Sequence, residues 1–458
     1  MAAGDQLILL DGQYSTATTG IMHWDTSMYG VNSAQVPSGV SLTRMTIVRA
    51  LNPGNVTING PLFIGRSARK DSFILIQGVT FEGTGDLYNT SFNTIKDCGF
   101  HGTLSIGTND HTNGNTDNLI EDVWVWAAEQ RIIAITYRGD RNVWRRVVVR
   151  GDGCSTAACL AGGSPNVGIT VYESHDVSLQ NVIVVDRVLT QAVIDAGNAY
   201  SDFAIAEHTP PQYLFGRNEW LGTISIKAPD SGYVMEPDVG GALDPTIKIS
   251  NAVAWDAVDS GFNLGRSGTN NLLENLTVNT RGGDGIRVAP ELTTGTLRNV
   301  IVDGAGRYGF NSAYTPTYVD VFNAVAGAYN QSTCSTGCFT SDPRAVATPS
   351  LKYLTRIETS SPLKGAGFGG ADIGANILFR YGVDGTRFGE TNYNTLTTTP
   401  LWPWPNESRI KSQMCASTTR GFCSSAAPLG GAGNPALTTL TTYIWEYLGN
   451  PIPVGIYP

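Results

Sequence analysis

Residues 198–245 hold a dense collection of side chains that could carry out carbohydrate chemistry. Aromatic rings can stack on the face of a sugar, acids and a base can move protons, and cations can hold a carboxylate. The candidate residues in this segment are His208, Arg217, Trp220, Lys227, Tyr233 and Glu236. The alternative is a solvated insertion whose charges pair with one another and bind nothing.

Two aspartates beyond this segment, Asp256 and Asp259, form a close carboxylate pair. Such a pair could act as acid and base in glycoside hydrolysis. Aspartate is also favoured in turns, and this pair lies where a strand must bend, so a turn role is the alternative. The sequence contains no Gly-rich phosphate loop, Ser-His-Asp order or zinc signature.

The run 109–117 is rich in side-chain oxygens that could bind calcium. The candidate ligands are Asp110, Asn113, Asn115 and Asp117. Their spacing matches no strict calcium-binding motif, and polar turns of this composition are common. A plain turn is therefore the alternative to a calcium site.

A repeated phrase indicates which elements must position these side chains. It reads apolar, spacer, Asn or Asp, and then two apolar residues around a spacer, and it recurs every 24 or 25 residues where copies are adjacent. Copies begin at Ile95, Ile120, Leu179, Ile249, Leu273 and Leu297. Alternation within each copy is the periodicity of a strand, and its break at the Asn or Asp marks a bend.

Such a period predicts coils that stack on one another, since one coil alone cannot bury its apolar face. The aligned Asn side chains can then form a hydrogen-bonded ladder. Arg146 interrupts this ladder, and Asn218 is the candidate ladder residue between Asn181 and Asn251.

A third strand follows the bend in several repeats, as in Gly285-Ile286-Arg287-Val288. Since Ile286 and Val288 point inward, Arg287 must point outward. The same alternation places further side chains outward: Asn263, Asn311, Thr170, Tyr172 and Lys227. Gly-Arg or Arg-Gly pairs after this strand add Arg66, Arg138 and Arg266.

Stacked at ~4.8 Å per coil, these side chains form a vertical stripe of cations, amides and hydroxyls. A stripe of this kind suits an extended saccharide chain. Turn residues without any ligand are the alternative for each arginine.

Three strands and three bends per coil make a parallel β-helix, and the chain resembles the right-handed parallel β-helix, or pectate-lyase-like, superfamily. The opening Leu7–Tyr14 is similar to the first coil of that superfamily, and the run 360–375 is similar to a phrase that often closes such domains. The predicted fold class is all-β, a single right-handed parallel β-helix solenoid. This scaffold hosts lyases, hydrolases, adhesins and phage tailspikes, so the resemblance alone does not choose an activity.

The favoured function, partly implied by the resemblance, is a secreted protein that binds and cleaves an acidic polysaccharide as a lyase. In β-elimination a base removes the proton next to a uronate carboxylate, and a cation stabilises the enolate. Arg287, Lys227 and Arg266 are the candidates for base and neutralising cation, with Tyr172 or Tyr233 as acid. Candidates for substrate binding are Arg66, Arg138, Asn263, Asn311, His208, Arg217 and Trp220.

Two other functions stay open. One is a glycoside hydrolase that uses Asp256 or Asp259 with another carboxylate such as Glu236. The other is a non-catalytic extracellular structural protein, adhesin or filament subunit that uses the solenoid as a rod.

The net charge and the cysteine content of the chain indicate which binding partners and which cellular location to expect. A net charge of −9 and a pI near 5.1 argue against nucleic acid as the main partner. No apolar run approaches the ~20 residues of a membrane span. Three close cysteine pairs predict local disulfides and a secreted, extracellular or periplasmic location, with free cytosolic thiols as the alternative. The pairs are Cys154 with Cys159, Cys334 with Cys338, and Cys415 with Cys423; the seventh, Cys98, is expected in the core.

The repeat predicts a solenoid over residues 1–375, with insertions at about 150–165 and 198–245 where the spacing lengthens. Residues 376–458 lack the repeat and contain a Trp-Pro cluster at 400–407. We expect helices near 407–414 and 437–448 and a cap or return strap, with self-association through this region as the alternative.

Overall fold

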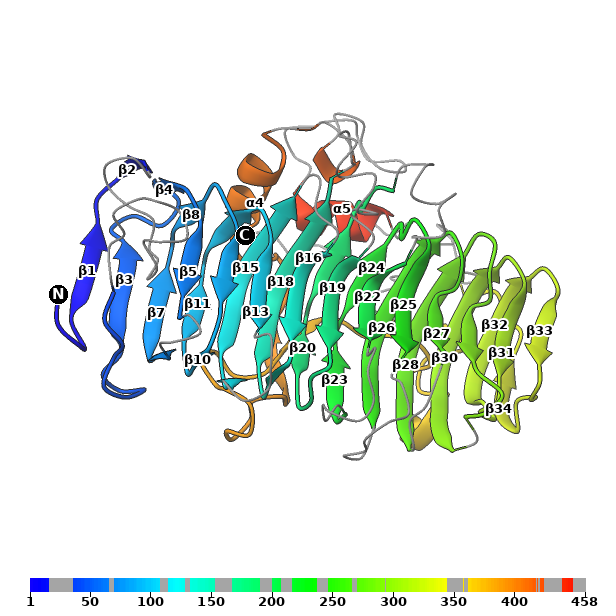
Figure 1. Cartoon of the computed structure of the whole chain (residues 1–458). Helices are drawn as coiled ribbons and strands as arrows, with labels where there is room; N and C mark the ends of the chain where they lie inside the picture. The colour runs from blue at the N-terminus through cyan, green and yellow to red at the C-terminus, as the bar shows by residue number, and fades with distance from the viewer. Residues whose placement is uncertain are drawn as a thin grey trace.

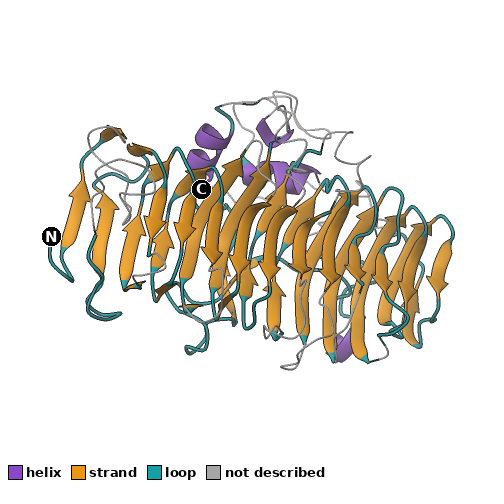
Figure 2. Cartoon of the chain, viewed as in Figure 1, coloured by secondary structure: helices purple, strands orange, loops and turns teal. Residues whose placement is uncertain are grey.

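The computed structural model shows successive coils stacked into an elongated solenoid, with the N-terminus at one end (Figure 1). Strands make up the stack and helices lie on its outside (Figure 2). The structure describes residues 1–15, 36–65, 70–107, 114–127, 132–152, 167–189, 200–206, 216–236, 246–265, 270–292, 294–343, 357, 361–416, 418, 421–423 and 439–447.

One face of the solenoid is an eleven-stranded parallel sheet, which we call sheet B. Its strands in stacking order are β5 (Leu62–Ile64), β9 (Gly85–Leu87), β13 (Leu104–Gly107), β16 (Ile132–Tyr137), β19 (Val167–Tyr172), β22 (Ser201–Ala206), β25 (Ser231–Glu236), β27 (Phe262–Leu264), β29 (Ile286–Val288), β31 (Tyr308–Ser312) and β33 (Gly327–Asn330). These are the third strands that the repeat predicts.

The other two faces form one nineteen-stranded sheet, sheet A, because long strands cross the bend between them. Its strands are β1 (Gln6–Leu9), β2 (Gly12–Ser15), β3 (Thr46–Ala50), β4 (Val56–Asn59), β7 (Ile74–Gln77), β8 (Thr80–Phe81), β11 (Thr94–Lys96), β12 (Gly99–His101), β15 (Leu119–Ala127), β18 (Val143–Gly151), β20 (Ser178–Gln180), β21 (Ile183–Val185), β23 (Asn218–Leu221), β24 (Ile224–Ile226), β26 (Ile247–Ala257), β28 (Asn271–Thr280), β30 (Gly295–Ala305), β32 (Thr317–Ala324) and β34 (Thr336–Phe339). A small corner sheet joins sheet B to sheet A: β6 (Asp71–Ser72), β10 (Thr90–Ser91), β14 (Asn115–Thr116) and β17 (Gly139–Asp140).

Stacking places equivalent residues above one another and builds the core from vertical rows. Ile120, Trp144, Leu179 and Trp220 occupy one such row, and all four are buried. Cys98 is also buried in the core, as predicted. The predicted fold class, an all-β parallel β-helix, is confirmed.

The repeating polar residue stands at the bend between the two faces of sheet A. The backbone is left-handed here, with φ from 49° at Asn181 to 56° at Asn275. Asn and Asp enter this region more readily than other non-glycine residues, which explains why the repeat selects them. We call these positions the bend row: Asp97, Asp122, Arg146, Asn181, Gly222, Asn251, Asn275 and Asn299.

The predicted Asn ladder forms only in part along the bend row. Asn299 Nδ2 donates to Asn275 Oδ1 at 3.0 Å. The placement of Asn218 in this ladder is wrong, because the strand register puts Gly222 there. Asn218 belongs to a different row, at the start of β23, where its Oδ1 accepts a hydrogen bond from the Val177 amide at 2.9 Å.

The chain returns along the bend row after the last coil, and we call residues 361–416 the strap. Its contacts run from the later coils back to the earlier ones: Phe368 N donates to Asn299 Oδ1 (2.8 Å), Asn376 N to Asn251 Oδ1 (3.1 Å), Tyr381 N to Asn181 Oδ1 (2.7 Å) and Asn406 Nδ2 to Asp97 Oδ1 (2.9 Å). A return strap was one of the two forms expected for this region. The domain boundary at residue 375 stays a prediction.

The strap contains a short 3-10 helix, a hairpin and an α-helix, and two further short helices follow it. In order these elements are η2 (Phe368–Gly370), β35 (Phe379–Tyr381), β36 (Leu396–Pro400), α4 (Glu407–Met414), η3 (Gly421–Cys423) and α5 (Leu440–Tyr447). The predicted helix at 407–414 is confirmed as α4, and α5 lies within the second predicted range. Trp402, Trp404 and Trp445 pack with these helices against Ile183 and Ile224 on the outside of sheet A.

A buried ionic cluster fastens the strap to the middle coils. The Arg145 side chain is fully buried and donates to the carbonyl oxygens of Val383, Thr386 and Tyr393 at 2.8, 3.1 and 2.9 Å. It also donates to Glu121 Oε2 at 2.9 Å. Arg145 therefore ties three strap carbonyls to the solenoid, and for the Thr386 carbonyl it is the one donor among the described residues.

Two of the three predicted disulfides are confirmed, Cys334–Cys338 and Cys415–Cys423. Cys154 and Cys159 lie outside the described residues. Within the described part of the chain, no helix has the length and apolar character needed to cross a membrane.

Substituting Arg145 tests this anchor. Arg145→Met removes a buried ion pair with Glu121 and three hydrogen bonds to the strap, so we expect the free energy of unfolding to fall by ~3–5 kcal/mol. Equilibrium urea unfolding measures the loss, and limited proteolysis reports release of the strap. Arg281→Met is the matched control, because it removes an Arg–Asp256 pair whose arginine side chain is 53% exposed and should cost ~0–1 kcal/mol. Equal stability of the two variants would contradict the anchor.

Acid should loosen the same anchor. Burial acts to raise the pKa of Glu121, but Arg146, Lys96 and the Gly385 amide outweigh it and lower the pKa to about 2. Because the folded-state pKa is depressed, this stabilisation is present above the unfolded value near 4.5 and is lost as pH falls toward 2. The contribution is about 3 kcal/mol. Urea unfolding from pH 6 to 3 should show a steeper loss of stability for the native chain than for Glu121→Gln; parallel curves would refute the assignment.

Candidate functional site

The outward side chains of sheet B form a continuous vertical row, and we call this surface the sheet-B face. In stacking order the row contains Phe63, Asp86, Ser105, Ile135, Thr170, Ala204, Val234, Asn263, Arg287 and Asn311. Its chemistry changes along the stack. The middle is mainly apolar and largely buried, whereas the last coils present amides and a cation.

Arg287 is the exposed member of this row in the last coils, as the alternation predicts. Its strand neighbours Ile286 and Val288 are fully buried, and the register places Asn263 and Asn311 directly on either side. No carboxylate among the described residues forms an ion pair with Arg287. The guanidinium is therefore available to an anionic ligand.

The amide of Asn311 is held within the protein. Its Nδ2 donates to Asp284 Oδ2 at 2.9 Å, and its Oδ1 accepts from Asn330 Nδ2 at 2.9 Å and Gln331 Nε2 at 2.8 Å. Asn311 thus has little capacity left for a ligand and holds the strand beside Arg287 in place. Asp284, which the sequence analysis missed, is signalled only by its place in the turn before β29.

A second cluster on sheet B surrounds Tyr172. Its ring stacks on Tyr137 at 5.1 Å, and the Arg138 guanidinium lies 4.8 Å from the Tyr137 ring. Arg138 Nε donates to the buried Glu173 carboxylate at 2.5 Å. Partial burial, together with the charge of Glu173, raises the pKa of Tyr172 to about 12. Tyr172 is therefore protonated at neutral pH, as an acid must be.

The structure does not bring Tyr172 and Arg287 together. Their strands, β19 and β29, are separated by β22, β25 and β27 in sheet B. Four steps of ~4.8 Å give roughly 19 Å, so these two residues cannot act on the same glycosidic bond. They can contact different units of one long polymer.

Three predicted site residues lie elsewhere than expected. Tyr233 is fully buried between Phe203 and Phe262, with ring distances of 4.6 and 4.2 Å, and burial raises its pKa well above the usual value. Trp220 is also a core residue. Both predictions are wrong, because neither side chain reaches the surface.

The placement of Lys227 on the third strand is also wrong. Lys227 lies at a left-handed bend after β24, a strand of sheet A. The apolar residues beside it, Ile224 and Ile226, face outward and are buried by the C-terminal helices. The C-terminal helices bury the outer face of sheet A at this point. The apolar residues on that face, Ile224 and Ile226, were therefore mistaken in the sequence for residues of the solenoid interior.

The predicted carboxylate pair is divided between two partners. Asp256 accepts two hydrogen bonds from Arg281, at 2.5 and 2.7 Å, as a turn residue would. Asp259 is stacked instead on Asp230 of the preceding coil through a backbone hydrogen bond of 3.0 Å. Burial, and secondarily the charge of Asp259, raises the pKa of Asp230 to about 6. Sequence reasoning missed Asp230, since nothing in the repeat marks it.

The charges near Arg217 pair locally, which matches the alternative given for this segment. Arg217 donates to both oxygens of Asp176, at 2.7 and 2.5 Å, and Asp176 lies 2.8 Å from His175. Burial lowers the pKa of His175, but the hydrogen bonds that His175 donates to the carboxylates of Asp140 and Asp176 outweigh it and raise the pKa to about 9. His175 is therefore charged at neutral pH and is not a general base.

The predicted calcium ligands that the structure describes have other partners. Asn115 is buried and its Oδ1 accepts from the Thr90 amide at 2.7 Å, while Asp117 Oδ1 accepts from Arg141 Nε at 2.8 Å. No group of three or more His, Cys, Asp or Glu side chains in the described residues could hold a metal ion. Asp110, Asn113, Arg66, Arg266 and His208, and the side chain of Glu236, lie outside the described part of the structure.

A hollow marks the first coils of the sheet-B face. Phe63, Asp86 and Ser105 of the outward row line it together with Pro61 and Thr84, and its volume is about 520 Å³. Phe63 is buried, so the groups that a sugar could contact in this hollow are the half-buried Asp86 and Ser105 side chains. The face therefore offers ligand-accessible groups at both of its ends.

Comparison with solved structures supports the fold. The A-module of the Azotobacter vinelandii mannuronan C-5 epimerase AlgE6 matches with a TM-score of 0.50 and 11% identity, over 74% of this chain and 91% of that one. This chain has a right-handed parallel β-helix fold. The right-handed parallel β-helix fold that the sequence predicts is thus confirmed.

Two further structures are similar at lower scores. Pectate lyase Pel9A has a TM-score of 0.45 and 14% identity, over 82% of this chain and 88% of that one. A family 6 polysaccharide lyase from Pseudopedobacter saltans has a TM-score of 0.36 and 12% identity, over 76% and 90%. No protein-family model matches the sequence, and a search of curated proteins finds no relative.

Proposed function

We propose that the protein acts outside the cytoplasm on an acidic polysaccharide, which it binds along the sheet-B face and cleaves by β-elimination. The observation that carries the proposal is Arg287, an exposed guanidinium at the centre of an amide-flanked row with no described acidic partner. The two disulfides support an oxidising compartment.

The ligand class follows from charge. The chain carries a net charge of −9, so a polyanion can approach closely only where cations are concentrated. Arg307, whose side chain is 54% exposed, lies one coil beyond Arg287 and is only loosely paired, 3.8 Å from Asp284. A uronate polymer fits such a surface, and the structurally similar epimerase module acts on mannuronan, itself a uronate polymer.

In the proposed reaction Arg287 holds the carboxylate of one uronate unit. Neutralising that carboxylate favours transfer of the adjacent carbon-bound proton to a base, because the resulting enolate carries negative charge. The electron pair then forms a carbon–carbon double bond as the glycosidic carbon–oxygen bond breaks, and the leaving oxygen takes up a proton. Tyr172 is too far away to protonate the same leaving group if Arg287 binds that unit.

A hydrolase is the second candidate because of the Asp230–Asp259 pair. Asp230, with a pKa of about 6, could act as the general acid, and Asp259 beside it as the second carboxylate of a hydrolase. This reaction would release reducing ends without forming a double bond.

The experiment is incubation with polymannuronate, polyguluronate and polygalacturonate while near-ultraviolet absorbance is recorded. A lyase produces an unsaturated uronate that absorbs, and Arg287→Ala should lower kcat/KM by about 100-fold or more, equivalent to about 3 kcal/mol. Arg44→Ala, an exposed arginine in the first coils, is the matched control and should retain full activity.

Other outcomes point elsewhere. Reducing ends without new absorbance, abolished by Asp230→Asn, would establish the hydrolase and refute the lyase. Altered uronate composition in proton NMR without cleavage would indicate epimerisation, which begins with the same proton removal. Binding without any product would support the non-catalytic alternative.

A further inference from the structure

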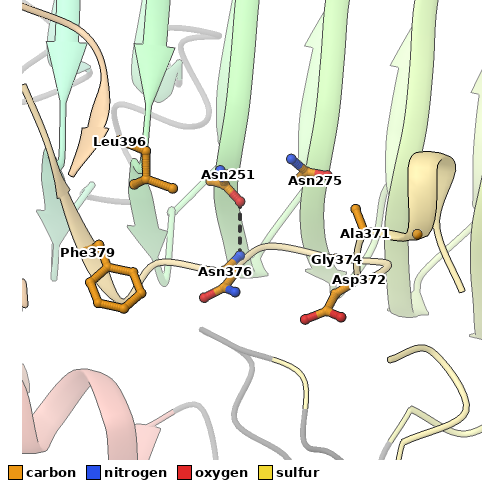
Figure 3. A pocket seen from close by; sticks show the side chains of 9 residues that line it. Asn251, Asn275, Ala371, Asp372, Gly374, Asn376, Phe379 and Leu396 are labelled. Atoms are coloured by element: carbon orange, nitrogen blue, oxygen red, sulfur yellow. Dashed lines mark hydrogen bonds between the residues drawn. The ribbon is translucent and has the colours of Figure 1, made fainter. Parts of the chain in front are cut away.

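A hollow of about 380 Å³ lies where the strap crosses the bend row, away from sheet B. Figure 3 shows Asn251 and Asn275 side by side, with Phe379 and Leu396 on one side and Asp372 on the other. The volume falls in the range of small-molecule sites, which are mostly apolar with a few placed polar groups.

The hollow lies where the Asn ladder is broken. Asn251 is engaged by the strap, since its Nδ2 donates to the Tyr381 hydroxyl at 2.6 Å and its Oδ1 accepts from Asn376 N at 3.1 Å. Asn275 Oδ1 accepts from Asn299. The Nδ2 group of Asn275 consequently has no partner among the described residues, and it lines the hollow.

An unpartnered acceptor accompanies this donor. The side-chain oxygen of Asn376, another residue of the lining, is buried and accepts no hydrogen bond within the described structure. Buried polar atoms in native proteins are nearly always satisfied by protein, water or ligand. Because this oxygen is buried from solvent, the polar group that the hollow presents to a ligand is the Asn275 donor, and a sugar hydroxyl can accept its hydrogen bond.

The remaining walls select the ligand further. Phe379 and Leu396 are 38% and 45% exposed and together give the hollow an apolar wall that a ligand could cover. An aromatic ring suits the apolar face of a sugar. The carboxylate in the lining, Asp372, is neutralised by Lys364 at 2.7 Å, so the hollow offers neither an unpaired cation for a uronate nor an unpaired acid for an amine.

We propose that this hollow binds a neutral sugar unit, as a glycan-binding site separate from the sheet-B face. The proposal does not depend on the proposed function, because it concerns another surface and a ligand without charge. A protein without any lyase activity could still have this site.

The test is saturation-transfer NMR and titration calorimetry with the methyl glycosides of glucose, galactose, mannose and xylose as probes. At least one should bind at millimolar concentration. Phe379→Ala should weaken it about fivefold or more, because the stacking surface is lost. Asn275→Asp should have a similar effect, since Asp keeps the acceptor that Asn299 uses and removes the donor.

Phe368→Ala is the matched control, a strap aromatic that is more exposed (49%) than Phe379 (38%) and does not line the hollow, and it should leave affinity within about twofold. Unchanged circular dichroism excludes unfolding as the cause of any loss. The absence of saturation transfer to all four glycosides, which a water-filled hollow would give, would overturn the proposal. Equal losses for Phe379→Ala and Phe368→Ala would also overturn it.

Discussion

The vertical register of the coils is the constraint on which the rest of the structure depends. Every repeating position lies about 4.8 Å from its equivalent in the next coil, so a polar side chain at that position must be able to pair with its neighbour. The bends satisfy this requirement in three ways: amide on amide at Asn275 and Asn299, acid on base at Asp122 and Arg146, and ring on ring at Phe73 and Phe92. Two aspartates in succession would repel, and Asp97 and Asp122 are tolerated because Asn406 and Arg146 pair with them.

The same bends also determine where the C-terminal part of the chain can bind. A left-handed Asn projects both an acceptor and a donor from the corner of the solenoid, and strap backbone amides use the acceptors of Asn181, Asn251 and Asn299. At Asn251 the strap takes the place of an amide–amide contact with Asn275, so docking the strap interrupts the ladder there. The unpartnered Asn275 donor is a direct consequence of this competition.

The sequence predicted the period, the bends and the outward position of Arg287, because each depends on local alternation within one coil. The prediction for Lys227 failed. Alternation of apolar and polar residues separates the two faces of a strand, but it does not show which face points into the solenoid. In the coils that contain β21 and β24 both faces of sheet A are buried, the outer one by Trp402, Ile410 and other residues of the C-terminal cluster, so Ile224 and Ile226 had the pattern of core residues. Tyr233 failed for a related reason, since a tyrosine can stack in the interior row when its hydroxyl finds Thr223 at 3.0 Å.

Charge pairing distinguishes structural arginines from a candidate ligand-binding one on this acidic solenoid. Arg138, Arg217 and Arg281 each have a carboxylate at hydrogen-bond distance, which the stack supplies because neighbouring coils place acid beside base. Arg287 instead has amides above and below it, and an amide cannot neutralise a guanidinium. Because no neighbouring carboxylate neutralises the Arg287 guanidinium, it must stay in contact with water when no ligand is bound. This explains why Arg287 is exposed. A carboxylate of a bound ligand would give Arg287 the acidic partner that Arg138, Arg217 and Arg281 find within the protein.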